Sequence, residues 1–348
     1  MFRPINIRTF TFFLSLWAGL QGTLQLGFVR LNLISLEHRF SFTTSQLAYI
    51  LASYDVASVF FLLPLTYMTA RSRVDKSRLF PLGLILMGVG ALILCIPQFL
   101  TPPVTITNSN NDTDLCIIGH EPPNLRVVEP APSRRVIVGI FVLGQALIGI
   151  GSTPLYTLAV TWIDENIPKR NSALYVGFFF TSTILGPAVG YIVGGYVLDH
   201  LHTDFLTQKM PLNIDSSSKA WIGAWWLLFM GIADISIVLG IVVFFYPKDL
   251  TRKEPAEMYN TQEQGDGKTP LRVMLKSLMQ NPIFTGLSLV SICEAYILSS
   301  FNSFMSKYVQ NQFGLSTEGS SIIMGCLIVP AGFLGIISGK LLQDCCIL

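Results

Sequence analysis

Apolar windows long enough to cross a lipid bilayer recur along the whole chain. A transmembrane helix needs roughly 20 mostly apolar residues, because each residue adds about 1.5 Å and the hydrocarbon core is about 30 Å thick. Overall the chain is 51% hydrophobic and 13% charged, whereas a soluble chain is about a quarter charged. We therefore expect an all-α, polytopic membrane protein with eight spans. The windows lie near 10–29, 46–68, 79–99, 136–160, 172–197, 223–246, 282–303 and 321–342.

Lys and Arg are divided unequally between the two sides of this predicted bundle. With the N-terminus in the cytoplasm, 15 of the 23 basic residues fall inside and 8 fall outside. The densest group, Arg71, Arg73, Lys76 and Arg78, lies in a short loop, where positive charge marks the cytoplasmic side most reliably. We therefore predict a multi-pass protein with both termini in the cytoplasm.

Two long loops organise the chain. The loop at 100–135 is polar and proline-rich and holds the single N-x-S/T triplet of the sequence, at Asn111. The predicted topology places this loop outside, so we expect Asn111 to be glycosylated. The second loop follows six windows, which is typical of transporters built from two six-helix halves. We divide the chain into a six-helix half at 1–246, a cytoplasmic linker at 247–281 and the start of a second half at 282–348.

The sequence carries no motif of an enzyme or of a metal site. It contains no H-E-x-x-H, no phosphate-cradling loop, no nucleophile elbow and no Cys/His cluster. All four histidines, His38, His120, His200 and His202, fall in predicted outer loops. We expect no catalytic residues, no metal, no cofactor and no nucleic-acid partner.

Small residues recur every four positions in the fifth window. Ser182, Gly186, Gly190 and Gly194 share one helical face, and Gly335 and Gly339 form a similar step in the eighth. Small residues let two helix backbones approach closely in a membrane. The stripe predicts either static packing or a sliding contact between two halves that open and close. Prolines within the windows often lie beside a transport pathway; they are Pro64, Pro154, Pro187 and Pro330.

Three acids lie deep in the windows: Asp55, Asp234 and Glu294. A carboxylate at the middle of a bilayer costs about 2.5–3.5 kcal/mol on insertion scales, and such residues often mark a substrate or ion pathway. We therefore consider Asp55 and Glu294 as pathway residues, and neutral, hydrogen-bonded packing is the alternative for Asp234 and Glu294. Two bases, Arg30 and Arg39, lie near the outer end of the first window. They could meet an arriving anion, although Arg30 could also simply extend to the membrane surface.

Three tryptophans stand before the sixth window in Trp221-Ile222-Gly223-Ala224-Trp225-Trp226. Trp favours the membrane–water boundary, so anchoring is one interpretation. The stretch also resembles the signature of the organic anion transporting polypeptides, a branch of the major facilitator superfamily. Ser218 and Ala220 depart from that signature, which has Asp and Arg there. Other blocks similar to the family follow its order, at 36–40, 151–156, 161–166, 172–175 and 185–188.

The resemblance implies sodium-independent uptake of large amphipathic organic anions, such as bile salts, conjugated steroids, thyroid hormones and drugs, by alternating access. It implies a major-facilitator-type helical bundle in the plasma membrane, with a central cavity between two halves. Under this hypothesis Trp225 and Trp226, with Trp221, offer flat apolar surfaces at the outer mouth. Arg30 and Arg39 then attract the anion, and Asp55 couples to helix rearrangement.

Two departures from the family shape these expectations. The family has twelve spans, so with eight we expect a C-terminally shortened member. Family members also carry a His in P-H-F at the outer end of span three, linked to stimulation by acidic medium, where this chain has Gln98. Two alternatives stay open. One is a non-transporting form that associates with full-length transporter and lowers its activity; the other is a membrane protein that binds without translocating.

Overall fold

The computed structural model describes residues 7–71, 76–102, 133–167, 169–206, 221–245 and 271–346. Within these ranges the chain forms helices, turns and one isolated bridge between His202 and Gly223. The helical elements are α1 (Ile7–Gln21), η1 (Gly22–Phe28), α2 (Val29–Leu31), α3 (Leu33–Phe40), α4 (Thr44–Arg71), α5 (Lys76–Leu100), α6 (Arg134–Asn166), α7 (Lys169–His200), α8 (Leu227–Phe245), α9 (Leu271–Gln280), α10 (Pro282–Phe313) and α11 (Thr317–Cys346).

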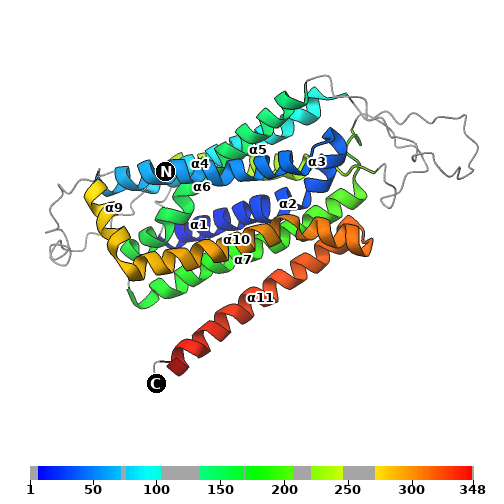
Figure 1. Cartoon of the computed structure of the whole chain (residues 1–348). Helices are drawn as coiled ribbons and strands as arrows, with labels where there is room; N and C mark the ends of the chain where they lie inside the picture. The colour runs from blue at the N-terminus through cyan, green and yellow to red at the C-terminus, as the bar shows by residue number, and fades with distance from the viewer. Residues whose placement is uncertain are drawn as a thin grey trace, which may run out of the picture.

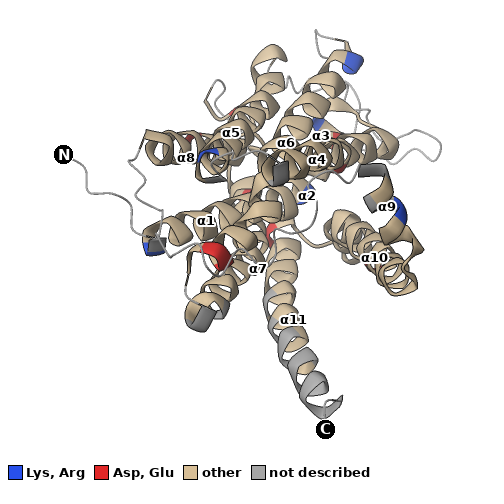
Figure 2. Cartoon of the chain, turned by 90° about the vertical axis from the view of Figure 1, so that its left-hand side faces the viewer, with Lys and Arg blue, Asp and Glu red and all other residues tan. Residues whose placement is uncertain are grey.

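The long helices lie side by side as a bundle (Figure 1) and carry few charged residues along their lengths (Figure 2). The predicted all-α membrane fold is therefore confirmed. The eighth predicted window, 321–342, falls within α11. In the described parts of the chain, seven segments are long and apolar enough to cross a membrane: Arg8–Leu31, Thr44–Thr69, Ser77–Leu100, Arg134–Asn166, Leu174–His200, Leu227–Phe245 and Pro282–Phe313.

The helices of the first 245 residues pack around shared aromatic contacts. Helix α5 packs against α6 and α8, and α4 packs against α6. Phe10 and Trp17 of α1 meet Phe80 of α5, with ring centroids 6.0 and 6.3 Å apart, and Trp162 of α6 lies 4.6 Å from Phe10. Large rings that pack edge to face contribute more than their buried area alone, so these contacts hold α1, α5 and α6 together.

The small-residue stripe of α7 packs against the first membrane helix. A methyl group added at Gly190 would lie 3.0 Å from the Cα of Gly27 in η1, and one at Gly22 would lie 2.9 Å from Cδ of Pro187. The Thr23 hydroxyl donates to the Gly186 carbonyl oxygen at 2.9 Å. These contacts join elements within residues 1–246, so the stripe does not form the predicted sliding contact between halves.

The remaining small residues of the prediction, Ser182 and Gly194 in α7 and Gly335 and Gly339 in α11, differ in what lies next to them. A methyl at Gly194 would meet the Phe28 ring, and a methyl at Gly19 would lie 3.7 Å from the Ser182 carbonyl oxygen. Another face of α7 contacts α11. Gly335 of α11 has no neighbouring atom within 4 Å of its would-be Cβ among the described residues, so it provides no packing step. Gly339 lies in a part of α11 whose side-chain surroundings are outside the description.

Candidate functional site

A cavity of about 320 Å³ lies between the first membrane helix, α4, α6 and α10. It brings together Arg30 and Asp55, two of the four charged residues that the sequence analysis considered as pathway residues. Most of its other polar residues were not anticipated, because single polar residues inside an apolar window carry no distinctive pattern. The polar lining consists of Gln21, Gln25, Arg30, Tyr54, Asp55, Tyr156, Ser299, Ser300 and Ser303.

A π-helical segment orients the first helix toward this cavity. In a regular α-helix of about 3.6 residues per turn, the nine steps from Gln21 to Arg30 make about 2.5 turns and place the two side chains on opposite faces. The segment η1 winds more slowly, because its hydrogen bonds reach five residues along the chain rather than four. Gln21, Gln25 and Arg30 consequently all line the same cavity.

Hydrogen bonds connect three helices at one wall of the cavity. Gln21 donates from Nε2 to the Tyr54 hydroxyl at 2.8 Å, and that hydroxyl is 2.9 Å from the Ser152 hydroxyl. The Tyr156 hydroxyl donates to Oε1 of Gln21. The network therefore joins α1 to α4 and α6 and pairs the polar side chains of Gln21, Tyr54 and Tyr156 with one another.

A second cavity of about 170 Å³ shares Tyr54 and Tyr156 with the first. Its hydroxyl-bearing residues bond within their own helices: Ser58 donates to the Tyr54 carbonyl and Thr153 to the Gly149 carbonyl, each at 2.8 Å. Thr157 donates likewise to the Thr153 carbonyl. Since these donors are satisfied, the second cavity presents a mainly apolar wall.

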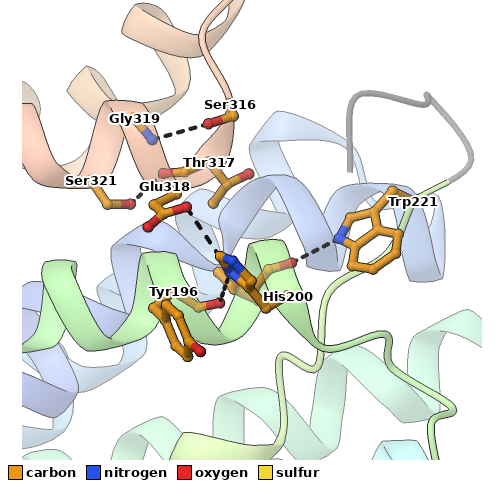
Figure 3. A network of polar contacts seen from close by, with 9 residues as sticks. Tyr196, His200, Trp221, Ser316, Thr317, Glu318, Gly319 and Ser321 are labelled. Atoms are coloured by element: carbon orange, nitrogen blue, oxygen red, sulfur yellow. Dashed lines mark hydrogen bonds and ion pairs between the residues drawn. The ribbon is translucent and has the colours of Figure 1, made fainter. Parts of the chain in front are cut away.

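Contacts between polar side chains join α10 and α11 to the earlier helices at the end of the bundle where α3 lies (Figure 1). Lys307 of α10 is 2.5 Å from a carboxylate oxygen of Glu37 in α3. His200, the last residue of α7, is 4.0 Å from Glu318 of α11, and its ring also contacts the Tyr196 carbonyl at 3.1 Å (Figure 3). The elements before and after residues 247–281 therefore meet at this end.

The tryptophans do not form an exposed surface, contrary to the sequence-based hypothesis. Trp225 is 0% exposed and packs against the rings of Phe40 and Phe141, and Trp226 is 2% exposed. The Trp226 indole donates to the Thr203 carbonyl at 2.9 Å. Only Trp221 keeps partial exposure, although its indole donates to the Leu198 carbonyl at 2.8 Å (Figure 3). Close packing between helices explains the buried positions of Trp225 and Trp226 better than contact with a ligand does.

Arg39 is also buried rather than presented to an arriving anion. Only 4% of it is exposed, and its guanidinium donates to the Thr101 hydroxyl at 3.1 Å and the Pro102 carbonyl at 2.8 Å. Burial lowers the pKa of Arg39, and the Asp204 carboxylate opposes that shift. Gln98 donates to the same carboxylate at 2.8 Å. Arg39 therefore fastens the ends of α3 and α5 together.

The remaining predicted residues lie elsewhere. Glu294 is exposed on α10 and lines neither of the two cavities, so the structure does not place it in a common site with Arg30 and Asp55. Asn111, the predicted glycosylation residue, lies outside the described residues. No group of three or more His, Cys, Asp or Glu residues suited to a metal occurs in the described parts of the chain.

Comparisons with known proteins agree on one family. A model of the Organic Anion Transporter Polypeptide (OATP) family matches residues 9–345. The chain is 32% identical to mouse solute carrier organic anion transporter family member 4A1, over 96% of this chain and 48% of the relative. It is 30% identical to human member 4C1, over 94% and 46%. The chain thus spans about half the length of the curated relatives it matches.

Solved structures show the same fold at low sequence identity. A bacterial homolog of the human lysosomal transporter Spinster, in an inward-facing and occupied conformation, matches with a TM-score of 0.64 at 15% identity, over 96% of this chain and 61% of the other. A D-xylose-proton symporter matches with a TM-score of 0.59 at 16% identity, over 96% and 69%. These likenesses confirm the predicted major-facilitator-type bundle.

Proposed function

The chain belongs to the Organic Anion Transporter Polypeptide (OATP) family, and from that premise we propose that its main cavity is part of a transport pathway for large amphipathic organic anions. The proposed ligands are bile salts, conjugated steroids, thyroid hormones and drugs of similar chemistry, carried independently of sodium. The proposed setting is the plasma membrane, with both termini in the cytoplasm.

The observation that carries the proposal is the position of Arg30. Its side chain lines a cavity among helices that are otherwise poor in charge, and a guanidinium withdrawn from water is unfavourable unless it is paired or hydrated. Asp55 lines the same cavity and attracts Arg30 electrostatically. An organic anion entering the cavity would compete with Asp55 for this positive charge.

The apolar part of an amphipathic ligand has a matching surface nearby. Binding sites for such molecules are mostly apolar, with a few polar groups that fix orientation. The rings of Tyr54 and Tyr156 line both cavities, and the second cavity offers satisfied hydroxyls and aliphatic groups. A rigid ring system could therefore lie against the tyrosines while its charged end faces Arg30.

Alternating access would require the halves to separate at one end of the bundle at a time. The Lys307–Glu37 and His200–Glu318 contacts join elements across the predicted division of the chain, and the positive-inside distribution assigns this end to the outside. We propose that these contacts close the outer end. A charge swap, Glu37→Lys with Lys307→Glu, should restore transport that either single change reduces.

Uptake of a labelled steroid sulfate by cells that express residues 1–348 tests the proposed function. We expect time-dependent accumulation that Arg30→Gln reduces at least tenfold and Arg30→Lys reduces less. Arg134→Gln is the matched control, because Arg134 begins α6 and is exposed. Undiminished uptake by Arg30→Gln, or saturable binding without accumulation at equal surface expression, would contradict the proposal.

A further inference from the structure

We propose that Gln25 and Arg30 together form a binding site for the oxyanion group of an amphipathic ligand, a sulfate ester or a carboxylate, at the wall of the main cavity. The inference rests on the proposed function, because it assigns residues within the same cavity. It adds a neutral side chain, Gln25, that favours a charged oxyanion group over an uncharged hydroxyl.

Gln25 lines the cavity with an amide that has no partner. The residue is 5% exposed and belongs to the π-helical segment η1. Its Oε1 is buried without a hydrogen-bond partner among the described residues, and its amide nitrogen bonds to none of them either. A primary amide has two N–H donors and an oxygen acceptor, and buried groups of this kind are almost always paired in folded proteins. The unpaired N–H donors of Gln25 therefore point to a ligand that accepts hydrogen bonds, whereas its Oε1 is itself an acceptor and takes no part in binding an oxyanion.

The π-helical segment explains why such an amide faces the cavity. Single π turns within membrane or soluble helices occur frequently at functional sites, because they shift side chains relative to the regular helix. Here Gly22 and Gly27 hold η1 close to Pro187 and Gly190 of α7. That close packing fixes the back of the segment, so the polar side chain on its other face keeps a defined position.

Arg30 supplies the charge that Gln25 lacks. Its guanidinium carries five N–H donors in a planar fork that matches the oxygens of a carboxylate or sulfate. The Gln25 amide lines the same cavity and can add an N–H donor to the charged acceptor, and hydrogen bonds to a charged acceptor are stronger than those between neutral groups. Asp55 lines the same cavity and attracts Arg30 electrostatically, so the anionic group of the ligand would compete with Asp55 for the guanidinium.

Serines of α10 also line the cavity. The Ser303 hydroxyl lines the cavity and makes no hydrogen bond with other described residues. It can donate to a further oxygen of the same group. A sulfate, with three terminal oxygens, can thus be shared between Gln25, Arg30 and Ser303, whereas an unconjugated hydroxyl offers a single oxygen without charge.

Gln145 of α6 provides a matched control for burial. It is 1% exposed and its Oε1 also lacks a partner among the described residues, yet it lines neither cavity. A Gln→Leu change there removes the same amide from a buried helix. If burial alone governed the effect, the two changes would behave alike.

Equilibrium binding to the purified chain in nanodiscs of zwitterionic lipid tests the proposal, with a tritiated steroid sulfate and the same steroid unconjugated as probes. We expect Gln25→Leu to raise the Kd for the sulfate about tenfold and to leave that for the unconjugated steroid within twofold. Gln25→Glu should weaken sulfate binding at least as much, since it places a negative charge beside the ligand. Gln145→Leu should change neither Kd.

The outcomes separate this inference from the proposed function. Equal effects of Gln25→Leu on both probes, or no effect on the sulfate, would overturn the site, as would a wild-type chain with no preference for the sulfate. A preserved preference without cellular uptake would overturn transport and leave the site standing. Repeating the assay in nanodiscs with anionic lipid shows whether a lipid phosphate occupies the same site. If it does, the affinity for the steroid sulfate falls in the wild type but not in Gln25→Leu. That result also supports an oxyanion site.

Discussion

The contact between α7 and the first membrane helix gives the sharpest test of the packing. Changing Gly190 to Ala adds a methyl carbon 3.0 Å from the Cα of Gly27 and nearer still to the Thr23 carbonyl oxygen. Carbon atoms pack best at about 3.5–4.0 Å, so the two backbones would have to separate by about 0.5–1 Å. Both neighbours are backbone atoms and cannot rotate away.

The expected cost follows from that separation. Inserting a methyl group into a well-packed interior costs about 1–3 kcal/mol, and moving η1 would also weaken the 2.9 Å hydrogen bond from Thr23 to Gly186. Gly177→Ala in the same helix is the control, because no atom lies within 4 Å of its would-be Cβ among the described residues. There Ala should be neutral or stabilise the helix by about 0.5–1 kcal/mol.

Thermal unfolding of the purified chain in detergent measures both changes. Gly190→Ala should lower the unfolding midpoint and weaken binding of a steroid sulfate, because η1 carries Gln25. Gly177→Ala should do neither. Equal midpoints for the two variants would refute the packing argument.

Three further predictions concern the helix contacts and the outer end. Tyr54→Phe should lower the free energy of unfolding by about 1–3 kcal/mol, because it leaves the buried Gln21 amide N–H without its partner, while Ser152 keeps its bond to the Ile148 carbonyl; Tyr49→Phe, at an exposed position in α4, should have no effect in the same chemical denaturation. Trp225→Ala should lower it by about 3–5 kcal/mol, as for a large buried ring, and retained stability would show that the indole is not a core residue. Burial is the main reason that the pKa of His202 lies below its ordinary value of 6.5, so the unfolded chain binds more protons and stability should fall as pH drops through 6.5. His202→Gln should flatten that fall in melts between about pH 5 and 7.5, and an unchanged slope would count against this assignment.

The membrane fold could be predicted from sequence because it depends on long apolar runs. Each of the seven helical segments that are long and apolar enough to cross a membrane coincides with a predicted window, since a helix in lipid satisfies its own backbone hydrogen bonds. The spacing of Gly186 and Gly190 likewise predicted close helix packing. It could not identify the partner helix, because small residues allow approach without specifying what approaches.

The site was only partly predictable. Arg30 and Asp55 stood out as charges near or within apolar windows, and the structure brings both to one cavity. Gln25 could not be predicted as a site residue, because a regular α-helix would not place Gln21, Gln25 and Arg30 on one face. Nothing in the residue types indicates a π-helical segment. The indoles of Trp225 and Trp226 were misassigned, since Trp at a predicted boundary suits both a wet surface and a packed core.

The most direct measurement of the central claim is a structure of the chain with an iodinated steroid sulfate, in which anomalous scattering locates the iodine. We predict iodine within the cavity between the first membrane helix, α4, α6 and α10, with the sulfate in contact with Arg30 and Gln25. Ligand found only against Trp221 or on the outer faces of the helices, with the cavity unoccupied, would contradict the account.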